Sequence, residues 1–442
     1  MKKVVVVFDG RVLANVVRKT ANRSGVYFTA YNFAQYFSKK CDFYLYADIA
    51  SHCILQKSFP EWKILQKRGR IFCMLSHLFY YKSKSKKRNL FTRAFSFFLA
   101  IVQKVFADRR APLPPISDIA SLFSSKSNPH EIASFKRAIF FSPFFMVPPP
   151  FQASKHFIKF VFLHDCIPLV LPEYFPKPSL IRDLFFGHLS FEALSQSLNA
   201  KDFYFVNSQY TKKDFLEFFP FMEEGKMQVI PLAADSKTFY PDFDAQKNQK
   251  IRSKYGIPQD VQYVFSLCSL EPRKNLVFVV ENFLAFLQKH KIQNLIFVMG
   301  GGGWAQFLPI LREKIKGFKE LEEKIFMIGY VDDEDLANLF AHSFCSIYLS
   351  HYEGFGMPAL EAMQCGAPII ASSTTSLPEV VGDAGILVDP KDAEALQEAL
   401  KRLYFDREFY HHCRERGVER AKKFDWEKSG AQMLQGFQKS LQ

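Results

Sequence analysis

From about residue 245 onward, the sequence alternates short apolar segments with longer amphipathic ones, and this alternation limits the possible folds more than any other feature. The apolar segments have the length of buried strands, and the segments between them carry apolar residues at helical spacing. Such alternation is typical of a parallel sheet covered by helices on both faces, with ligands at the carboxyl ends of its strands. The expected strands are residues 263–267, 295–299, 325–328, 345–349, 368–371 and 386–388.

The first half of the chain has the same character but a less regular pattern. Its expected strands are residues 4–8, 43–46, 157–163 and 203–206, and Ser208 is the expected N-cap of the helix after the last of them. Because 442 residues exceed what one core usually holds, we expect two α/β domains, at residues 1–235 and 245–424. Residues 60–150 carry a basic, aromatic stretch and proline clusters, which we interpret as an irregular insertion.

The cysteines and the N-terminus bear on the cellular location. Eight cysteines show no C-x2-C pair and no histidine cluster at ligand spacing, so neither a zinc site nor a disulfide framework is indicated. The basic N-terminus precedes only five apolar residues before Asp9, too few for a signal peptide. No apolar run approaches the roughly 20 residues that cross a bilayer. We therefore expect a cytoplasmic protein with reduced thiols.

Most of the net charge of +14 is concentrated in one segment, which begins with Lys67 and ends with Arg110. It holds twelve Lys and Arg residues against one acidic residue, a net charge of +11. Basic and aromatic side chains alternate there, as in segments that dock on an anionic membrane surface. Nucleic acid could use the same mixture, but no recognition module accompanies it. We therefore expect peripheral contact with the inner face of the membrane and no nucleic-acid partner.

The segment HYEGFGMPALEAMQCGAP, residues 351–368, carries the strongest chemical signal. Glu353 follows a buried strand, and Glu361 lies in what we expect to be the first turn of a helix that starts near Met357 with Pro358 at its first position. Each carboxylate can accept two hydroxyl protons, and the start of a helix favours anions. The pair therefore predicts a ligand with two sets of vicinal hydroxyls separated by phosphate, such as a nucleotide-sugar.

Two other enzyme classes are less compatible with this segment. Gly354 to Ala359 matches the dinucleotide-binding pattern G-x-G-x-x-A. However, the next expected strand ends in Ser372 and Ser373 instead of the acid that binds an adenosine ribose, and the motif lies late in its sheet. A glycosidase needs two carboxylates on opposite sides of one bond, whereas these project from one loop and its helix.

The same segment, with Ser372, Ser373 and LPEVVGDAGILVDP (residues 377–390), resembles the E-x7-E region of the retaining family 4 glycosyltransferases. That family includes sucrose-phosphate synthases and bacterial O-antigen and capsule mannosyltransferases. The resemblance implies the GT-B fold, in which two Rossmann-like domains face each other across a cleft. It also implies that the last helix, within residues 425–442, crosses back to the first domain.

The resemblance further implies a set of donor-binding residues. Glu361 would hold the ribose hydroxyls and Glu353 would lie near the donor sugar. Gly25 matches the first-domain glycine loop that approaches the donor phosphates, and Val331 lies in the region beside the nucleobase. The loop before the helix would add its own contacts, from Gly354, Phe355, Gly356 and Met357.

Three further residues complete the predicted catalytic group with Glu353. Arg273 and Lys274 follow the first strand of the second domain, in a segment that resembles the family's phosphate-binding loop, and could neutralise a leaving diphosphate. The alternative is a solvated helix start. His164 ends a strand in HDCIPL, which resembles the H-D-x-I-P-L run of O-antigen transferases, where the histidine lies close to the donor sugar. The alternative is a histidine satisfied within the core.

The predicted activity is that of a retaining, metal-independent hexosyltransferase acting on a growing or lipid-linked glycan, without a cofactor. Guanosine diphosphate mannose is the expected donor, on the likeness of the HDCIPL run. The acidic run at residues 332–335 is interpreted as a helix cap and first turn, not a metal site. A nucleotide-sugar 2-epimerase of the same fold and a catalytically silent binding module are the alternatives.

Overall fold

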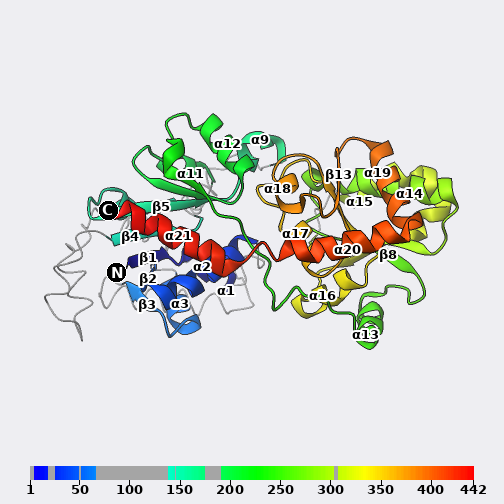
Figure 1. Cartoon of the computed structure of the whole chain (residues 1–442), viewed down its shortest axis with the longest axis horizontal. Coiled ribbons are helices and arrows are strands. Elements are labelled where there is room, and N and C mark those ends of the chain that lie inside the picture. Colours follow the sequence, from blue (N-terminus) through cyan, green and yellow to red (C-terminus); the bar gives the residue numbers. More distant parts are fainter. Residues whose placement is uncertain are drawn as a thin grey trace, which may run out of the picture.

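The computed structural model describes residues 4–17, 25–48, 51–65, 138–144, 146–174, 191–302 and 307–442. These residues form two domains, each built on a parallel sheet that helices cover on both faces (Figure 1). This arrangement confirms the predicted α/β class with two Rossmann-like domains. No helix among the described residues is long and apolar enough to cross a membrane.

The first domain contains seven strands within the described residues, in the order β3-β2-β1-β4-β5-β6-β7. They are β1 (Val5–Asp9), β2 (Asp42–Tyr46), β3 (Lys63–Leu65), β4 (Ala138–Ser142), β5 (Phe157–Leu163), β6 (Phe203–Val206) and β7 (Met227–Val229). The helices that accompany them are α1 (Arg11–Val17), α2 (Gly25–Lys40), α3 (His52–Ser58), α8 (Pro149–Gln152), α9 (Ile167–Val170), α11 (Phe191–Ser197) and α12 (Gln209–Phe218). Ser208 caps α12 as expected, because its side chain accepts a hydrogen bond from the Thr211 N–H.

The predicted irregular insertion at residues 60–150 is wrong at both ends. β3 and β4 lie within it, and β4 pairs in parallel with both β1 and β5 in the middle of the sheet. The sequence of β4, AIFFS, is a short apolar run, but the basic and proline-rich residues around it hid this signal. The strongly basic segment at residues 67–110 lies outside the described residues.

The second domain contains six strands in the order β10-β9-β8-β11-β12-β13, all parallel within the described residues. They are β8 (Gln262–Leu267), β9 (Leu295–Gly300), β10 (Ile325–Gly329), β11 (Cys345–Tyr348), β12 (Ile369–Ser372) and β13 (Ile386–Val388), each within one residue of its prediction. Their helices are α13 (Ala245–Tyr255), α14 (Leu276–His290), α15 (Phe307–Ile315), α16 (Asp333–Ala341), α17 (Met357–Gln364), α18 (Leu377–Val381), α19 (Ala393–Phe405) and α20 (Arg407–Ala421). The strand order reverses between β8 and β11, which is where such sheets bind ligands.

The last helix, α21 (Trp426–Ser440), leaves the second domain and lies on the first, against α2 (Figure 1). Its Phe437 is fully buried and its ring packs against those of Phe37, Phe141, Phe160 and Phe205. Burial of one such side chain stabilises a fold by about 1.5 to 3 kcal/mol. This helix therefore ties the end of the chain to the core of the first domain.

Candidate active site

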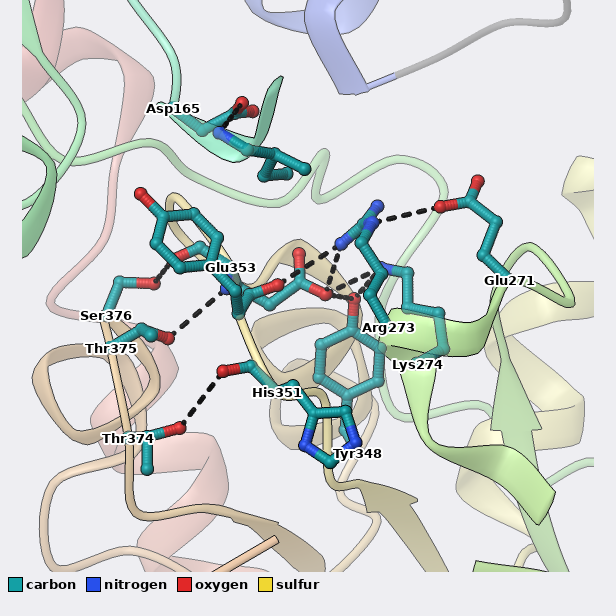
Figure 2. A network of polar contacts seen from close by, with 12 residues as sticks. Asp165, Glu271, Arg273, Lys274, Tyr348, His351, Glu353, Thr374, Thr375 and Ser376 are labelled. Atoms are coloured by element: carbon teal, nitrogen blue, oxygen red, sulfur yellow. Dashed lines mark hydrogen bonds and ion pairs between the residues drawn. The ribbon is translucent and has the colours of Figure 1, made fainter. Parts of the chain in front are cut away.

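The candidate active site lies where the carboxyl ends of β8 and β11 meet, at the reversal of strand order in the second sheet. A short 3-10 turn, η4 (Pro272–Lys274), follows β8 and carries Arg273 and Lys274. The loop between β11 and α17 carries Glu353. The two segments are distant in the sequence, and the sheet brings these three side chains into one network (Figure 2).

The Glu353 carboxylate is held by three donors on one of its oxygens. Its Oε1 atom accepts from Lys274 Nζ at 2.7 Å, from Arg273 Nη1 at 2.9 Å and from the Tyr348 hydroxyl at 2.9 Å. Within the described residues no hydrogen bond to Oε2 is found, and Figure 2 shows this oxygen pointing away from the three donors. Because Glu353 is only 8% exposed, its carboxylate is fixed, with one oxygen left to accept hydrogen bonds from a ligand.

Opposite charges keep this network ionised. Burial raises the pKa of the Glu353 carboxyl, but the charges of Lys274 and Arg273 outweigh burial and bring the pKa down to about 2. Burial likewise lowers the pKa of the Arg273 guanidinium, and the Glu353 charge more than restores it, so the pKa is raised. Arg273 also donates from Nε to Glu271 at 2.9 Å. The two predicted cations are thus already balanced by carboxylates before any diphosphate arrives.

The main chain of Glu353 is fixed as well. Its N–H donates to Thr375 Oγ1 at 3.2 Å, and its carbonyl oxygen accepts from Ser376 Oγ at 2.9 Å (Figure 2). On the other side of the loop, the His351 N–H donates to the Arg273 carbonyl at 2.8 Å. The loop therefore presents Glu353 from a backbone whose polar groups are paired.

Glu361 lies on α17, which begins at Met357 with Pro358 in its first turn, as expected. Glu361 is the fifth residue of this helix, so it lies in the second turn and not in the predicted first turn, since a turn takes 3.6 residues. The side chain is partly exposed, and no hydrogen bond to it is found among the described residues. Burial raises the pKa of its carboxyl to about 8, Lys274 opposes this shift, and Asp333 adds to it. Glu361 is therefore largely protonated at neutral pH.

Two glycines of this loop are required by their surroundings. Gly356 has φ 105°, in the left-handed region that disfavours side chains, and a Cβ there would lie 2.5 Å from Leu377. A Cβ on Gly354 would lie 2.1 Å from the carbonyl oxygen of His164, so the two domains meet there through their main chains. Gly25, the first residue of α2, faces Met357 across the domains, where an added Cβ would lie 3.9 Å from its Cγ.

Two other predicted donor-binding residues point into the protein. Phe355 is 5% exposed, and its ring packs edge-to-face on Phe424. Val331 is 4% exposed and lies against Gly300, where a Cβ would approach it to 2.9 Å. In this structure these two residues can offer a ligand main-chain atoms only.

His164 lies in the first domain just after β5. Its Nε2 atom is 2.8 Å from the Pro143 carbonyl oxygen, and since a carbonyl can only accept, Nε2 carries the proton. Burial lowers the pKa of its imidazole to about 4, although the bond to Pro143 opposes this shift. His164 is therefore neutral at pH 7, with Nδ1 as its acceptor.

Sequence reasoning missed Asp165, which faces the network from the first domain (Figure 2). Its Oδ1 accepts from the Ile167 N–H at 3.1 Å. Burial raises the pKa of its carboxyl to about 6, against the Ile167 hydrogen bond and the charge of Arg273. Tyr348 was also missed, because the last residue of an apolar strand looks like core. The HDCIPL run did contain a signal for Asp165, but only its histidine was singled out.

The acidic run forms the start of α16, as predicted. Asp333 is the first residue of the helix, and Lys254 Nζ pairs with Asp332 at 2.7 Å and with Asp335 at 2.5 Å. Among the residues that the structure describes, no group of three or more His, Cys, Asp or Glu side chains is placed to hold a metal ion.

Comparisons with known proteins agree with this geometry. Residues 247–420 match the family model of the glycosyl transferases group 1. The O-antigen chain mannosyltransferase B of Escherichia coli is 28% identical over 330 residues, which cover 74% of this chain and 81% of that protein. The serotype-specific mannosyltransferase WbdA of the same species is 25% identical over 279 residues, 63% of this chain and 33% of its own length.

The fold is shared with solved glycosyltransferases. A glycosyltransferase from Rickettsia africae ESF-5 superposes with a TM-score of 0.63 over 100% of both chains, at 16% identity. With the two facing Rossmann-like domains, this likeness shows the GT-B fold. Residues 247–420 therefore form a domain of the glycosyl transferases group 1 family, in a GT-B chain that resembles bacterial O-antigen mannosyltransferases.

Proposed function

We propose that this protein transfers a hexose from a nucleoside diphosphate sugar to a hydroxyl of a growing glycan, with retention of configuration. The observation that carries the proposal is the state of Glu353. Three donors fix one of its oxygens, and the other is left as an acceptor at the sheet's switch point, beside two cations. A carboxylate in that state suits a polyhydroxylated ligand that also bears phosphate.

Each part of the donor has a matching group in this proposal. Glu353 Oε2 accepts from hydroxyls of the hexose, and Glu361 accepts from the ribose diol. The diphosphate lies beside Arg273 and Lys274, which share their charge between Glu353 and the phosphate oxygens. As the diphosphate leaves, its negative charge grows, so these fixed cations stabilise the transition state more than the ground state.

The proposed mechanism uses the leaving phosphate as the base for the acceptor hydroxyl, on the same face of the sugar. His164 is neutral, with its Nε2 proton committed to Pro143, which suits a hydrogen-bond acceptor toward the sugar better than a proton donor. Two guanidinium and ammonium charges stand where other glycosyltransferases use a divalent ion, so we propose that turnover needs no metal.

The names of the relatives support the choice of sugar and acceptor. Both Escherichia coli proteins are mannosyltransferases, and one acts on the O-antigen chain. We propose guanosine diphosphate mannose as the donor and a lipid-linked glycan as the acceptor. The net charge of +11 at residues 67–110 supports contact with an anionic membrane, where such an acceptor resides.

Incubation with a panel of guanosine and uridine diphosphate hexoses tests this proposal. Nucleoside diphosphate release that depends on a glycan acceptor would support it. A 2-epimerase would release a free epimer without any acceptor, and a silent binding module would bind the donor without turnover, so either result would contradict it.

A further inference from the structure

A carboxylate of the second domain caps a helix of the first, close to the candidate active site. Glu379 on α18 accepts hydrogen bonds from the backbone N–H groups of Gln209 and Tyr210, both at 2.7 Å. These are the first two residues of α12, and the third N–H, that of Thr211, is capped by Ser208. The first N–H groups of a helix have no partner within it, and its positive end favours a carboxylate. The second domain thus completes the cap of α12.

The segment that carries Glu379 also holds the main chain of Glu353. Thr375 and Ser376, directly before α18, make the two hydrogen bonds to the Glu353 N–H and carbonyl described above. Arg420 on α20 donates to the Glu379 carbonyl oxygen at 2.5 Å and to that of the next residue at 2.9 Å, which fixes the other end of the short helix. One helical turn therefore connects the interdomain cap to the backbone of the candidate catalytic glutamate.

The residues on both sides of that glutamate contact α12 and its cap as well. The Gly354 carbonyl oxygen accepts from Ser208 Oγ at 2.7 Å and from Thr211 Oγ1 at 3.0 Å. The Tyr352 hydroxyl donates to Asp214 on α12. All of these groups are buried. The loop therefore adopts its observed conformation against the first domain, and the contacts require the two domains to be closed.

We propose that Glu379 is a positioning residue for the transfer reaction: its carboxylate latches the second domain onto α12 and thereby holds the Glu353 loop in place. This inference rests on the proposed function for its role in turnover, but the latch itself does not. Both oxygens of Glu379 are engaged at α12, Oε2 with Gln209 and Oε1 with Tyr210, so the role concerns closure and not contact with the donor. Charge-assisted hydrogen bonds of this kind are stronger than neutral ones.

Two single changes break the latch from opposite sides. Glu379→Gln keeps the shape of the side chain and removes its charge. Gln209→Pro removes one of the two N–H donors, and proline suits this position because it is the first of the helix. Ser208 before it is extended, with φ −148° and ψ 162°, as a residue before proline should be. Glu394→Gln is the matched control, since Glu394 is an exposed acid in the first turn of another helix of the second domain.

Hydrogen–deuterium exchange of the unliganded full chain tests the latch without reference to any reaction. We expect the start of α12 and the loop at residues 351–356 to exchange about tenfold faster in Glu379→Gln and in Gln209→Pro, because each loses a charge-assisted bond. The combined variant should show less than the sum of the two effects, since both remove one contact. Exchange equal to that of the wild type and of Glu394→Gln would overturn the latch, whether or not the protein proves to be a transferase.

Steady-state kinetics then tests the positioning role. In both variants we expect acceptor-dependent turnover to fall about tenfold, while the Kd for GDP or UDP, whichever the wild type binds, changes less than about threefold. Unchanged turnover despite faster exchange would overturn the role of Glu379 in positioning. A wild type without any transferase activity would instead refute the proposed function and leave the exchange result to decide the latch.

Discussion

The Nζ atom of Lys274 lies 2.7 Å from the Oε1 atom of Glu353, and both residues are buried at the switch point of the second sheet. Arg273 contacts the same oxygen at 2.9 Å. Two positive charges therefore converge on one carboxylate oxygen and leave the other to a ligand. The arrangement makes Glu353 both a structural partner of the two cations and a group that a sugar hydroxyl can reach.

Replacing Glu353 should destabilise the second domain as well as impair activity. Glu353→Gln leaves two buried cations without their carboxylate, and removal of one partner from a buried ion pair typically costs about 3 to 5 kcal/mol. We expect urea denaturation to show a loss of about 3 kcal/mol in the free energy of unfolding. Glu271→Gln is the control, because its side chain is 43% exposed and such pairs contribute less than about 1 kcal/mol. Equal losses in the two variants would contradict this account of the network.

This ion-pair network shows what the sequence could not predict. Glu353 and its cationic partners were each recognised as candidates from their motifs, and the positions of their strands followed from the alternation of apolar and amphipathic segments. Nothing in the sequence showed that residues 79 positions apart would pair on one oxygen, because that contact depends on how β8 and β11 lie side by side.

The weaker predictions have equally specific causes. β4 was missed since prolines and basic residues surround its five apolar residues. Glu379 was seen only as part of a family motif, because its partners are backbone N–H groups of another domain, and main-chain partners leave no trace in side-chain identity. Phe355 and Val331 were placed in the donor site by resemblance, while their apolar side chains are buried.

The affinity for the donor nucleotide should depend on pH through Glu361. Its pKa of about 8 means that the free protein must lose a proton before a carboxylate can accept from the ribose diol. Nucleoside diphosphate binding measured by calorimetry should therefore strengthen about tenfold from about pH 7 to about pH 9, well above the phosphate pKa of about 6. Glu361→Gln should remove this dependence.

The same raised pKa has an opposite consequence for stability. The folded state holds the Glu361 proton more tightly than the unfolded state, so this contribution to stability is complete below the unfolded pKa of about 4.5 and is lost as the pH rises through about 8. Glu361→Gln should lose less stability than the wild type over that range. A steeper loss in the variant, or identical pH profiles of nucleotide binding, would contradict the role given to Glu361.

Transfer should continue in excess EDTA. Arg273 and Lys274 supply the positive charge that a divalent ion would otherwise bring to the leaving diphosphate, so chelation should leave the turnover number within about twofold of its value. Turnover that disappears on chelation and returns with Mg²⁺ or Mn²⁺ would show that a metal takes part. The acidic residues at 332–335 would then need a role beyond their pairing with Lys254.

The basic segment at residues 67–110 should bind anionic membranes. Each engaged Lys or Arg contributes about 1 kcal/mol near an anionic surface, and salt screens that attraction. We expect the full chain to sediment with vesicles that contain phosphatidylglycerol and to be released by about 0.5 M salt. Equal recovery on neutral vesicles, or binding indifferent to salt, would show that the segment does not dock on membranes by charge.

The central claim is that Glu353 serves the transfer of a hexose from a nucleotide donor to a glycan. The most direct test follows isotopically labelled mannose from guanosine diphosphate mannose into a glycan acceptor, in the wild type and in Glu353→Gln under conditions where both remain folded. The account predicts labelled product with retained anomeric configuration in the wild type and at least a hundredfold lower rate in the variant. Inverted product, or equal rates of labelling in the two proteins, would contradict it.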